Sequence, residues 1–203
     1  KIKVNEKKIK SNHRVQINDQ ISISSEYRNL KKEKEYLFDT NSKKEIDEMI
    51  VYQDDEILIL NKPSGIAVQG GTKIKKSIDT LLRSSFKSVK TRLVHRLDKD
   101  TSGILIIALN RQIADHMSYL FREKKIIKNY WALNVGKLKK GKGVINKKIK
   151  KKNSKTYDKA LTEYTNYMII NNNLNFLIFK PITGRNHQIR IHSKELGIPI
   201  LGD

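Results

Sequence analysis

The sequence contains no cysteine. This absence excludes disulfides, thiolate catalysis and zinc sites built from cysteine, and it suits a protein of the reducing cytoplasm, which is the location we expect. No apolar run approaches the ~18 residues of a membrane span, so we expect no membrane partner. The longest run, Gly103–Leu109, has the length of a buried strand. The N-terminus has neither a starting Met nor the apolar core of a signal peptide, which favours a fragment of a longer chain.

Acidic residues are scarce relative to basic ones. Lys and Arg number 42 against 21 Asp and Glu, which gives a formal net charge of +21. Such a surplus indicates a polyanionic partner, either nucleic acid or an acidic membrane, although a Lys-rich proteome would be a simpler explanation. A membrane-surface role would concentrate the charge on one amphipathic helix beside large apolar residues. Because the charge is spread over the whole chain, nucleic acid is favoured.

The chain divides by composition into three parts. Residues 1–28 are typical of short strands joined by Asn-containing turns, and they are too few to bury a core of their own. Residues 29–48 are dense in Lys and Glu with little periodicity, which predicts a solvated linker. Residues 49–203 carry the apolar patterns of a folded domain.

Within that domain, apolar runs and periodicity predict both strands and helices. The strands are expected at 50–52, 57–60, 103–109, 130–135 and 174–179, and the helices at 78–86, 111–123 and from near His187 to a C-cap at Gly197. The elements mix without a regular strand–helix–strand rhythm. We therefore predict an α+β fold with a mixed, mostly antiparallel sheet.

Two segments receive a more specific interpretation. Alternation places Trp131, Leu133 and Val135 on one face of a half-buried strand. Residues 137–155 contain ten lysines and no acidic residue, which is typical of a basic loop or loose hairpin. That segment is equally compatible with an unstructured solvated excursion and with an arm that contacts phosphates.

The densest polar cluster is His95-Arg96-Leu97-Asp98-Lys99-Asp100-Thr101-Ser102-Gly103, a loop between two apolar runs. A rigid scaffold can present side chains from such a loop. Asp98 shares it with Arg96 and Lys99, and a carboxylate among cations keeps the negative charge that a nucleophile needs. Spacing alone favours the simpler interpretation that Asp98 or Asp100 caps the turn through the amides of Thr101 and Ser102.

A second cluster follows Thr183-Gly184, where the chain turns into the last predicted helix. Four basic side chains crowd this turn: Arg185, His187, Arg190 and His192. A helix N-terminus already favours anions, so one arginine could pair with Asp98 while others hold phosphates. The alternative is a generic basic helix.

Other chemistries are disfavoured by spacing. His187 and His192 are five residues apart, which does not place both on one helix face, and no His-Glu-x-x-His is present, so we expect no metal. Asp98 and Asp100 are too close in sequence to flank a glycosidic bond. The glycines near Gly70 are not followed by the Gly-Lys-Ser/Thr of a phosphate-binding loop.

Four blocks in order resemble the RluA-type pseudouridine synthases. They are Ile57–Val68 with Gly70-Gly71, His95–Gly103, Lys128–Leu133, and Thr183–His192 running on to Leu201-Gly202-Asp203. The resemblance covers about residues 49–203 and implies the pseudouridine synthase fold, with a central catalytic cleft, truncated here at its C-terminus. Residues 1–28 are similar to the end of an αL-type RNA-binding module. The combination is similar to the RluC-like branch, which modifies large-subunit ribosomal RNA.

The resemblance also implies roles for individual residues. Asp98 matches the catalytic aspartate, Tyr130 the tyrosine that stacks on the flipped uracil, and Arg190 the basic partner of the catalytic carboxylate. Arg96 matches the arginine that enters the RNA stack, and Ile189 an apolar residue of the pocket. His95, Arg185 and His187 belong to the same motifs and are expected to bind RNA.

The resemblance implies a cofactor-independent isomerase that acts on RNA, and we expect a monomer. Two other classes are weighed against it. One is a non-catalytic RNA-binding or ribosome-assembly protein of the same fold, which would have no chemical need for Asp98, Tyr130 and Arg190 together. The other is a metal-dependent nuclease, which chelation of the metal would inactivate.

Overall fold

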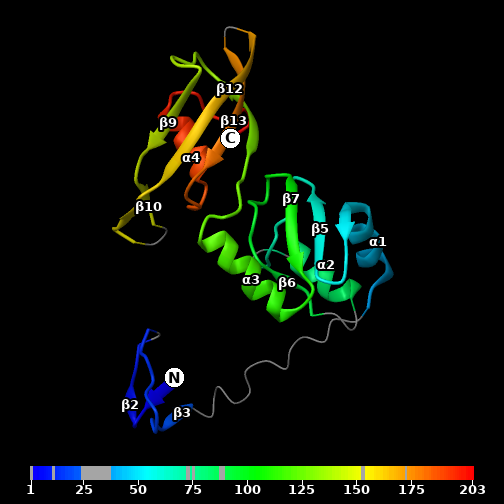
Figure 1. Ribbon diagram of the computed structural model, residues 1–203, viewed down its shortest axis with the longest axis vertical. Coiled ribbons are helices and arrows are strands. Elements are labelled where there is room, and N and C mark those ends of the chain that lie inside the picture. Colours follow the sequence, from blue (N-terminus) through cyan, green and yellow to red (C-terminus); the bar gives the residue numbers. More distant parts are fainter. Residues whose placement is uncertain are drawn as a thin grey trace.

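The computed structural model describes residues 2–10, 12–23, 38–71, 74, 76–86, 90–151, 154–171 and 173–203 (Figure 1). None of the helices in these ranges is both long enough and apolar enough to cross a membrane. Within them, all pairing between named strands is antiparallel, and helices pack against the sheets. The α+β prediction is therefore confirmed.

The N-terminal residues form a small sheet of three strands. The strands are β1 (Ile2–Val4), β2 (Lys7–Lys8) and β3 (Ile21–Ile23), in the order β2-β1-β3. The Asn5 side chain joins the turn after β1 to the segment before β3. It donates to Asp19 at 2.7 Å and accepts from the amide of Gln20 at 2.9 Å. A strand expected at residues 14–15 does not form, and residues 24–37 lie outside the described ranges.

The predicted linker is wrong over residues 40–48, which belong to helix α1 (Thr40–Met49). Asp39 caps this helix by accepting from the amide of Ser42 at 2.9 Å. Ile46 is fully buried in the core that α1 shares with helix α2 (Ile78–Ser85) and the neighbouring sheet (Figure 1). One buried isoleucine per two turns gives too weak a period to distinguish this segment from a charged linker.

The described residues from Phe38 onward contain two four-stranded sheets, and we call this part of the chain the larger unit. Its first sheet has the order β4-β5-β7-β6. Its strands are β4 (Ile50–Gln53), β5 (Ile57–Lys62), β6 (Arg92–Leu93) and β7 (Gly103–Ala108), and helix α3 (Arg111–Arg122) follows β7. Alternate residues of β5 and β7 are buried against α1 and α2, which makes this the main hydrophobic core. The loop 94–102 leaves this sheet between β6 and β7.

The second sheet has the order β8-β13-β12-β9. Its strands are β8 (Tyr130–Val135), β9 (Lys142–Asn146), β12 (Leu161–Asn171) and β13 (Leu174–Pro181), and a hairpin of β10 (Ile149–Lys150) and β11 (Tyr157–Asp158) joins β9 to β12. Helix α4 (Gln188–Glu195) lies beside the sheet and is followed by Gly197, whose φ of +76° suits the turn after the helix (Figure 1). Buried Leu177, Phe179 and Ile198 fill the second core.

Strand β8 turns its apolar face to the solvent, although the apolar pattern suggests that this face is buried. Trp131 is 66% exposed and Leu133 and Val135 are also exposed, whereas the alternate residue Asn134 is fully buried. The Asn134 side chain donates to the carbonyl of Ile198 at 2.8 Å, which fixes the segment after α4. The buried amide has its partner 64 residues away, and such pairing cannot be deduced from local alternation.

We expect that Ile46→Ala will lower the free energy of unfolding by about 2–4 kcal/mol, because it leaves a cavity in a core without void space. The measurement is urea unfolding followed by circular dichroism. Lys44→Ala, in an exposed position of the same helix, is the matched control and should change stability by less than ~0.5 kcal/mol. Equal, small effects for both variants would mean that α1 is a linker segment after all.

Candidate active site

A cleft of about 250 Å³ brings together loops of the first sheet and the start of α4. Its first wall comes from the segment after β5 and from the β6–β7 loop, and its second wall from α4. The lining residues are Ala67, Val68, Gln69, Ile74, Arg96, Leu97, Asp98, Lys99, Asp100, His187 and Arg190. Segments more than eighty residues apart in the chain therefore meet at Asp98.

The Asp98 side chain is not used to close its own turn. The turn is held by the Asp98 backbone carbonyl, which accepts from the amide of Thr101 at 3.2 Å. The carboxylate is 28% exposed, lines the cleft, and lies 3.8 Å from Nε2 of His187. Of the two interpretations left open by spacing, capping through the carboxylate does not occur among the described residues.

The loop that carries Asp98 rests on a buried lysine. Lys62, at the end of β5, is fully buried. Its ammonium donates to the carbonyls of Pro63 and Ile66 at 2.8 Å each and to that of Lys99 at 3.1 Å. Burial lowers the pKa of Lys62, and the carboxylates of Asp100 and Asp98 partly oppose this shift. One ammonium thus ties the 63–66 turn to the residue next to Asp98.

Two further hydrogen bonds join the same two loops. The amide of Gly65 donates to the Lys99 carbonyl at 3.0 Å, and the Ser64 hydroxyl donates to the Asp100 carbonyl at 2.9 Å. The backbone that follows Asp98 is therefore fixed at Lys99 and Asp100. Sequence reasoning gave no role to Lys62, so this buried lysine was missed.

His95 is turned away from the cleft, contrary to its predicted place among the RNA-binding residues. Its Nε2 accepts from the amide of Ile106 at 2.8 Å, and its ring stacks on Phe121 with centroids 4.5 Å apart. Burial, followed by the positive charge of Lys128, lowers the pKa of His95 to about 4. The neutral ring therefore fastens the start of the loop to β7 and α3.

Tyr130 stands where the two halves of the larger unit meet. It is half-buried and packs against both hydrophobic cores. Burial, and then the negative charge of Asp98, raise the pKa of its hydroxyl, so the ring stays protonated near neutral pH. The Tyr130 hydroxyl is thus within electrostatic range of the Asp98 carboxylate.

Arg190 does not form the predicted direct ion pair with Asp98. Its guanidinium pairs with the Asp203 carboxylate, which is the main reason that the pKa of Arg190 is raised and that of Asp203 lowered. Asp98 and Asp100 raise the pKa of Arg190 further, so their negative charges reach it across the cleft. The interaction between Arg190 and Asp98 is therefore long-range, and the direct ion pair of the guanidinium is with Asp203.

His187 is the basic side chain within 4 Å of the Asp98 carboxylate among the described residues. It precedes α4 with a φ of 51°, in the left-handed region, which costs a non-glycine residue about 1–3 kcal/mol. This backbone turn accompanies the approach of its ring to Asp98. The side chain from this segment that meets Asp98 is therefore a histidine, where the sequence analysis suggested an arginine.

A buried polar network holds α4 in place. The Gln188 side chain donates to the hydroxyl of Thr162 at 2.8 Å, and that hydroxyl contacts Nδ1 of His192 at 2.9 Å. Nε2 of His192 lies 3.2 Å from the Lys147 carbonyl, and burial lowers the pKa of His192. The fully buried imidazole is thus neutral and joins the helix to strand β12 and to the segment that follows β9.

The remaining predicted residues lie in different places. Arg96 is exposed at the cleft. Arg185 points to the hairpin instead, with its Nε donating to the Lys159 carbonyl at 3.1 Å and its guanidinium 3.5 Å from Asp158. Ile189 packs against the second core and is not among the residues that line the cleft. Neither Arg185 nor Ile189 is among the residues that line the cleft, and their expected contacts with RNA stay predictions.

The cleft places the Asp98 carboxylate opposite His187 and Arg190, and the Tyr130 hydroxyl is within electrostatic range of that carboxylate. Among the described residues no group of three or more His, Asp or Glu side chains is arranged to hold a metal ion. A carboxylate with a nearby tyrosine and arginines can support proton transfer or covalent attack on a bound ring or sugar.

Residues 56–195 match the model of a protein family described as RNA pseudouridylate synthase. The chain belongs to this family. The resemblance noted from the four sequence blocks is thereby confirmed, and the matched range contains Asp98, Tyr130 and Arg190.

Curated relatives carry the name ribosomal large subunit pseudouridine synthase C. The protein of Rickettsia conorii is 38% identical over the whole of this chain, which spans 72% of that relative. The protein of Vibrio parahaemolyticus is 37% identical, again over the whole of this chain and over 67% of the relative.

Solved structures in the same family have the same fold. Human RNA pseudouridylate synthase domain containing 4 superposes with a TM-score of 0.69 at 28% identity, covering 79% of this chain and 69% of the human one. Human RNA pseudouridylate synthase domain containing 1 gives 0.64 at 27% identity, with 76% and 67% covered. The pseudouridine synthase fold is therefore confirmed.

We expect Lys62→Met to lower the free energy of unfolding by about 2–4 kcal/mol, because three carbonyls lose a charged donor in a buried site. Thermal and urea unfolding provide the measurement. Lys99→Met alters the exposed side chain of the residue whose carbonyl Lys62 binds, so it serves as the control and should cost little. Comparable stability of Lys62→Met and the wild type would disprove the bracing role.

The pKa of His95 also predicts a pH dependence of stability. Because the folded-state pKa of about 4 lies below the usual 6.5, the unfolded chain binds more protons between these values. Stability should therefore fall as the pH drops from 6.5 to 4, by about 3 kcal/mol in total from this group. His95→Gln keeps a hydrogen-bond acceptor but cannot titrate. Between pH 6.5 and 4 its free energy of unfolding, measured by urea titration, should therefore fall by about 3 kcal/mol less than that of the wild type. Parallel pH profiles for the two proteins would contradict the assignment.

Proposed function

We propose that this chain converts specific uridines of large-subunit ribosomal RNA to pseudouridine, with Asp98 as the catalytic carboxylate. Family membership supports the reaction, and the printed names of the Rickettsia and Vibrio relatives support the RNA class. The observation that carries the proposal is the Asp98 side chain. It is free of its own turn and faces a cleft assembled from both halves of the unit.

The reaction is an isomerisation that needs no external reagent. The bond between ribose C1′ and uracil N1 breaks, the ring turns, and C1′ bonds to C5. The proton displaced from C5 leaves, and N1 gains one, so that atoms and electrons balance. A site with a carboxylate, a tyrosine and cations has the groups that such proton movements and charge changes require.

Each site residue has a role in this proposal. Asp98 acts as an anion on the sugar or the ring, and Tyr130 stacks on the flipped uracil with its hydroxyl toward the carboxylate. Arg190, held by Asp203, supplies positive potential on the opposite wall of the cleft from Asp98. His187 approaches the same carboxylate at 3.8 Å and adds positive charge when it is protonated.

The substrate base must leave its stack before it can reach Asp98. Extrusion costs a few kcal/mol, and stacking of the base on an aromatic ring recovers about 1–3 kcal/mol of it. Arg96, exposed at the cleft, is placed to occupy the gap in the RNA. The net charge of +21 supplies affinity that does not depend on sequence and weakens with salt.

The decisive experiment maps pseudouridine in large-subunit RNA by carbodiimide-stop sequencing, after incubation with the wild type or with Asp98→Asn. We expect new stops with the wild type and a rate at least about a hundredfold lower with the variant, because the amide can neither accept a proton nor attack. Asp100→Asn, two residues away in the same loop, is the matched control and should retain most of the rate.

Two results would contradict parts of the proposal separately. No new stops with the wild type on any uridine of large-subunit RNA would disprove the proposed substrate. New stops at equal rates with the wild type and Asp98→Asn would leave the substrate standing but remove Asp98 from catalysis.

A further inference from the structure

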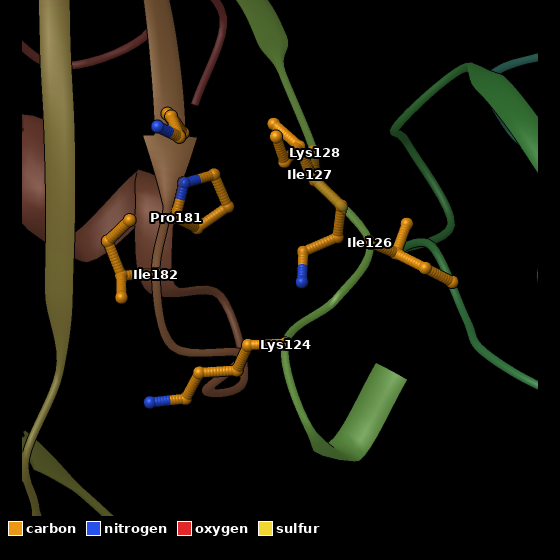
Figure 2. Close-up of a pocket in the computed structure, with 7 residues that line it drawn as sticks. Lys124, Ile126, Ile127, Lys128, Pro181 and Ile182 are labelled. Atoms are coloured by element: carbon orange, nitrogen blue, oxygen red, sulfur yellow. The ribbon is translucent and has the colours of Figure 1, made fainter. Parts of the chain in front are cut away.

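A second, smaller pocket lies outside the cleft, between the connection that joins α3 to β8 and the end of β13. Its volume is about 60 Å³. Figure 2 shows Lys124, Ile127 and Lys128 on the connection, with Pro181 and Ile182 on the other side. Ile126 and Lys180 complete the lining. We call this pocket the lysine notch.

Two of the three lysines in the notch have no counter-ion in the described part of the chain. Lys180 forms an ion pair with Glu163 at 3.4 Å, but neither Lys124 nor Lys128 pairs with a described carboxylate. Lys128 is half-buried, and both burial and the charge of Lys124 lower its pKa. The same pocket is thus lined by two lysines without a described carboxylate partner, and a bound anion would stabilise this arrangement.

The notch is close to the proposed site of the flipped base. Lys128 lies two residues before Tyr130, so their Cα atoms are at most about 7 Å apart. Its charge also reaches His95, at the start of the loop that presents Asp98. A nucleic-acid strand whose base lies at Tyr130 would therefore carry its neighbouring backbone past the notch.

We propose that the lysine notch binds a backbone phosphodiester of the RNA next to the target uridine, through the ammonium groups of Lys124 and Lys128. The inference rests on the proposed RNA substrate and deepens it. Lysine is suited to this task as a compact, mobile charge that can approach a phosphate oxygen from several directions. Pro181 is buried and Ile182 is half-buried, so one side of the contact is apolar and screens the charges less than water would.

The test measures binding of a fluorescently labelled, uridine-containing RNA hairpin over a series of NaCl concentrations. For Lys124→Gln/Lys128→Gln we expect the Kd to rise about three- to tenfold near 0.15 M salt, and the slope of log Kd against log salt to fall by about 0.7–0.9 for the one phosphate lost. Lys44→Gln/Lys90→Gln removes the same charge from exposed sites elsewhere and should leave the slope closer to that of the wild type.

Two further arms make the outcome decisive. Lys124→Arg/Lys128→Arg keeps the charges and should keep most of the slope, which separates phosphate binding from a loss of packing. Inorganic phosphate at constant ionic strength should weaken RNA binding by the wild type and the Lys44/Lys90 control but not by the Gln variant. Equal slopes for the two Gln double variants would overturn the proposal. So would phosphate binding at the notch that leaves the RNA affinity unchanged, since the notch would then serve free phosphate.

This result is independent of turnover. A wild type that binds the hairpin through the notch and forms no pseudouridine would disprove the proposed function and leave the phosphate contact standing. Pseudouridine formation by the wild type, with an unchanged salt slope in the Lys124/Lys128 variant, would support the proposed function and disprove the phosphate contact.

Discussion

The position of the Asp98 carboxylate depends on a single buried ammonium group. Lys62 has no carboxylate within bonding distance in the described chain and satisfies its charge with three backbone carbonyls instead. A buried cation with complete carbonyl coordination is stable only while all of these carbonyls keep their places. Because one of them belongs to Lys99, the charge of Lys62 fixes the backbone beside Asp98. The side chain of Asp98 is thereby left for the cleft.

A second constraint acts from the opposite wall. Helix α4 brings His187 and Arg190 to the cleft only if its position along the second sheet and its rotation about its own axis are fixed. The chain of Gln188, Thr162 and His192 fixes both, since each member is buried and each hydrogen bond would be costly to lose. The two walls are thus held by separate polar networks, and Tyr130 packs against the hydrophobic cores on both sides. The geometry of the site therefore depends on the Lys62 network, the α4 network and the packing of Tyr130 together.

Sequence reasoning succeeded where the signal is local. The apolar run before Leu109 predicted β7, and the 3.6-residue period predicted α3 almost to its ends. It failed where partners are distant. Nothing in the spacing around Arg190 indicates that Asp203, rather than Asp98, takes its guanidinium, because that choice depends on side-chain geometry after folding. The eleven-residue strand β12 was missed because burial alternates only in its first half, at Thr162 and Tyr164, while its apolar residues Met168 to Ile170 are exposed.

The family signature brought together residues that the structure then separates by task. His95 was grouped with Arg96 and Asp98 because they are adjacent, yet its ring points to β7 and only its neighbours reach the cleft. Motif membership reports that a residue matters and is silent on whether it acts on substrate or supports the loop.

The distribution of paired and unpaired cations suggests how affinity and chemistry are divided. Arg190 has a carboxylate partner within the protein, and the ring of His187 lies near Asp98, so neither is a free phosphate ligand. Lys124 and Lys128, outside the cleft, have no such partner among the described residues. Within the cleft, Arg96 and Lys99 also lack a carboxylate partner among the described residues. A phosphate contact at the notch would add a hold on the RNA backbone outside the cleft, while the neutral uracil ring and its ribose approach the Asp98 carboxylate.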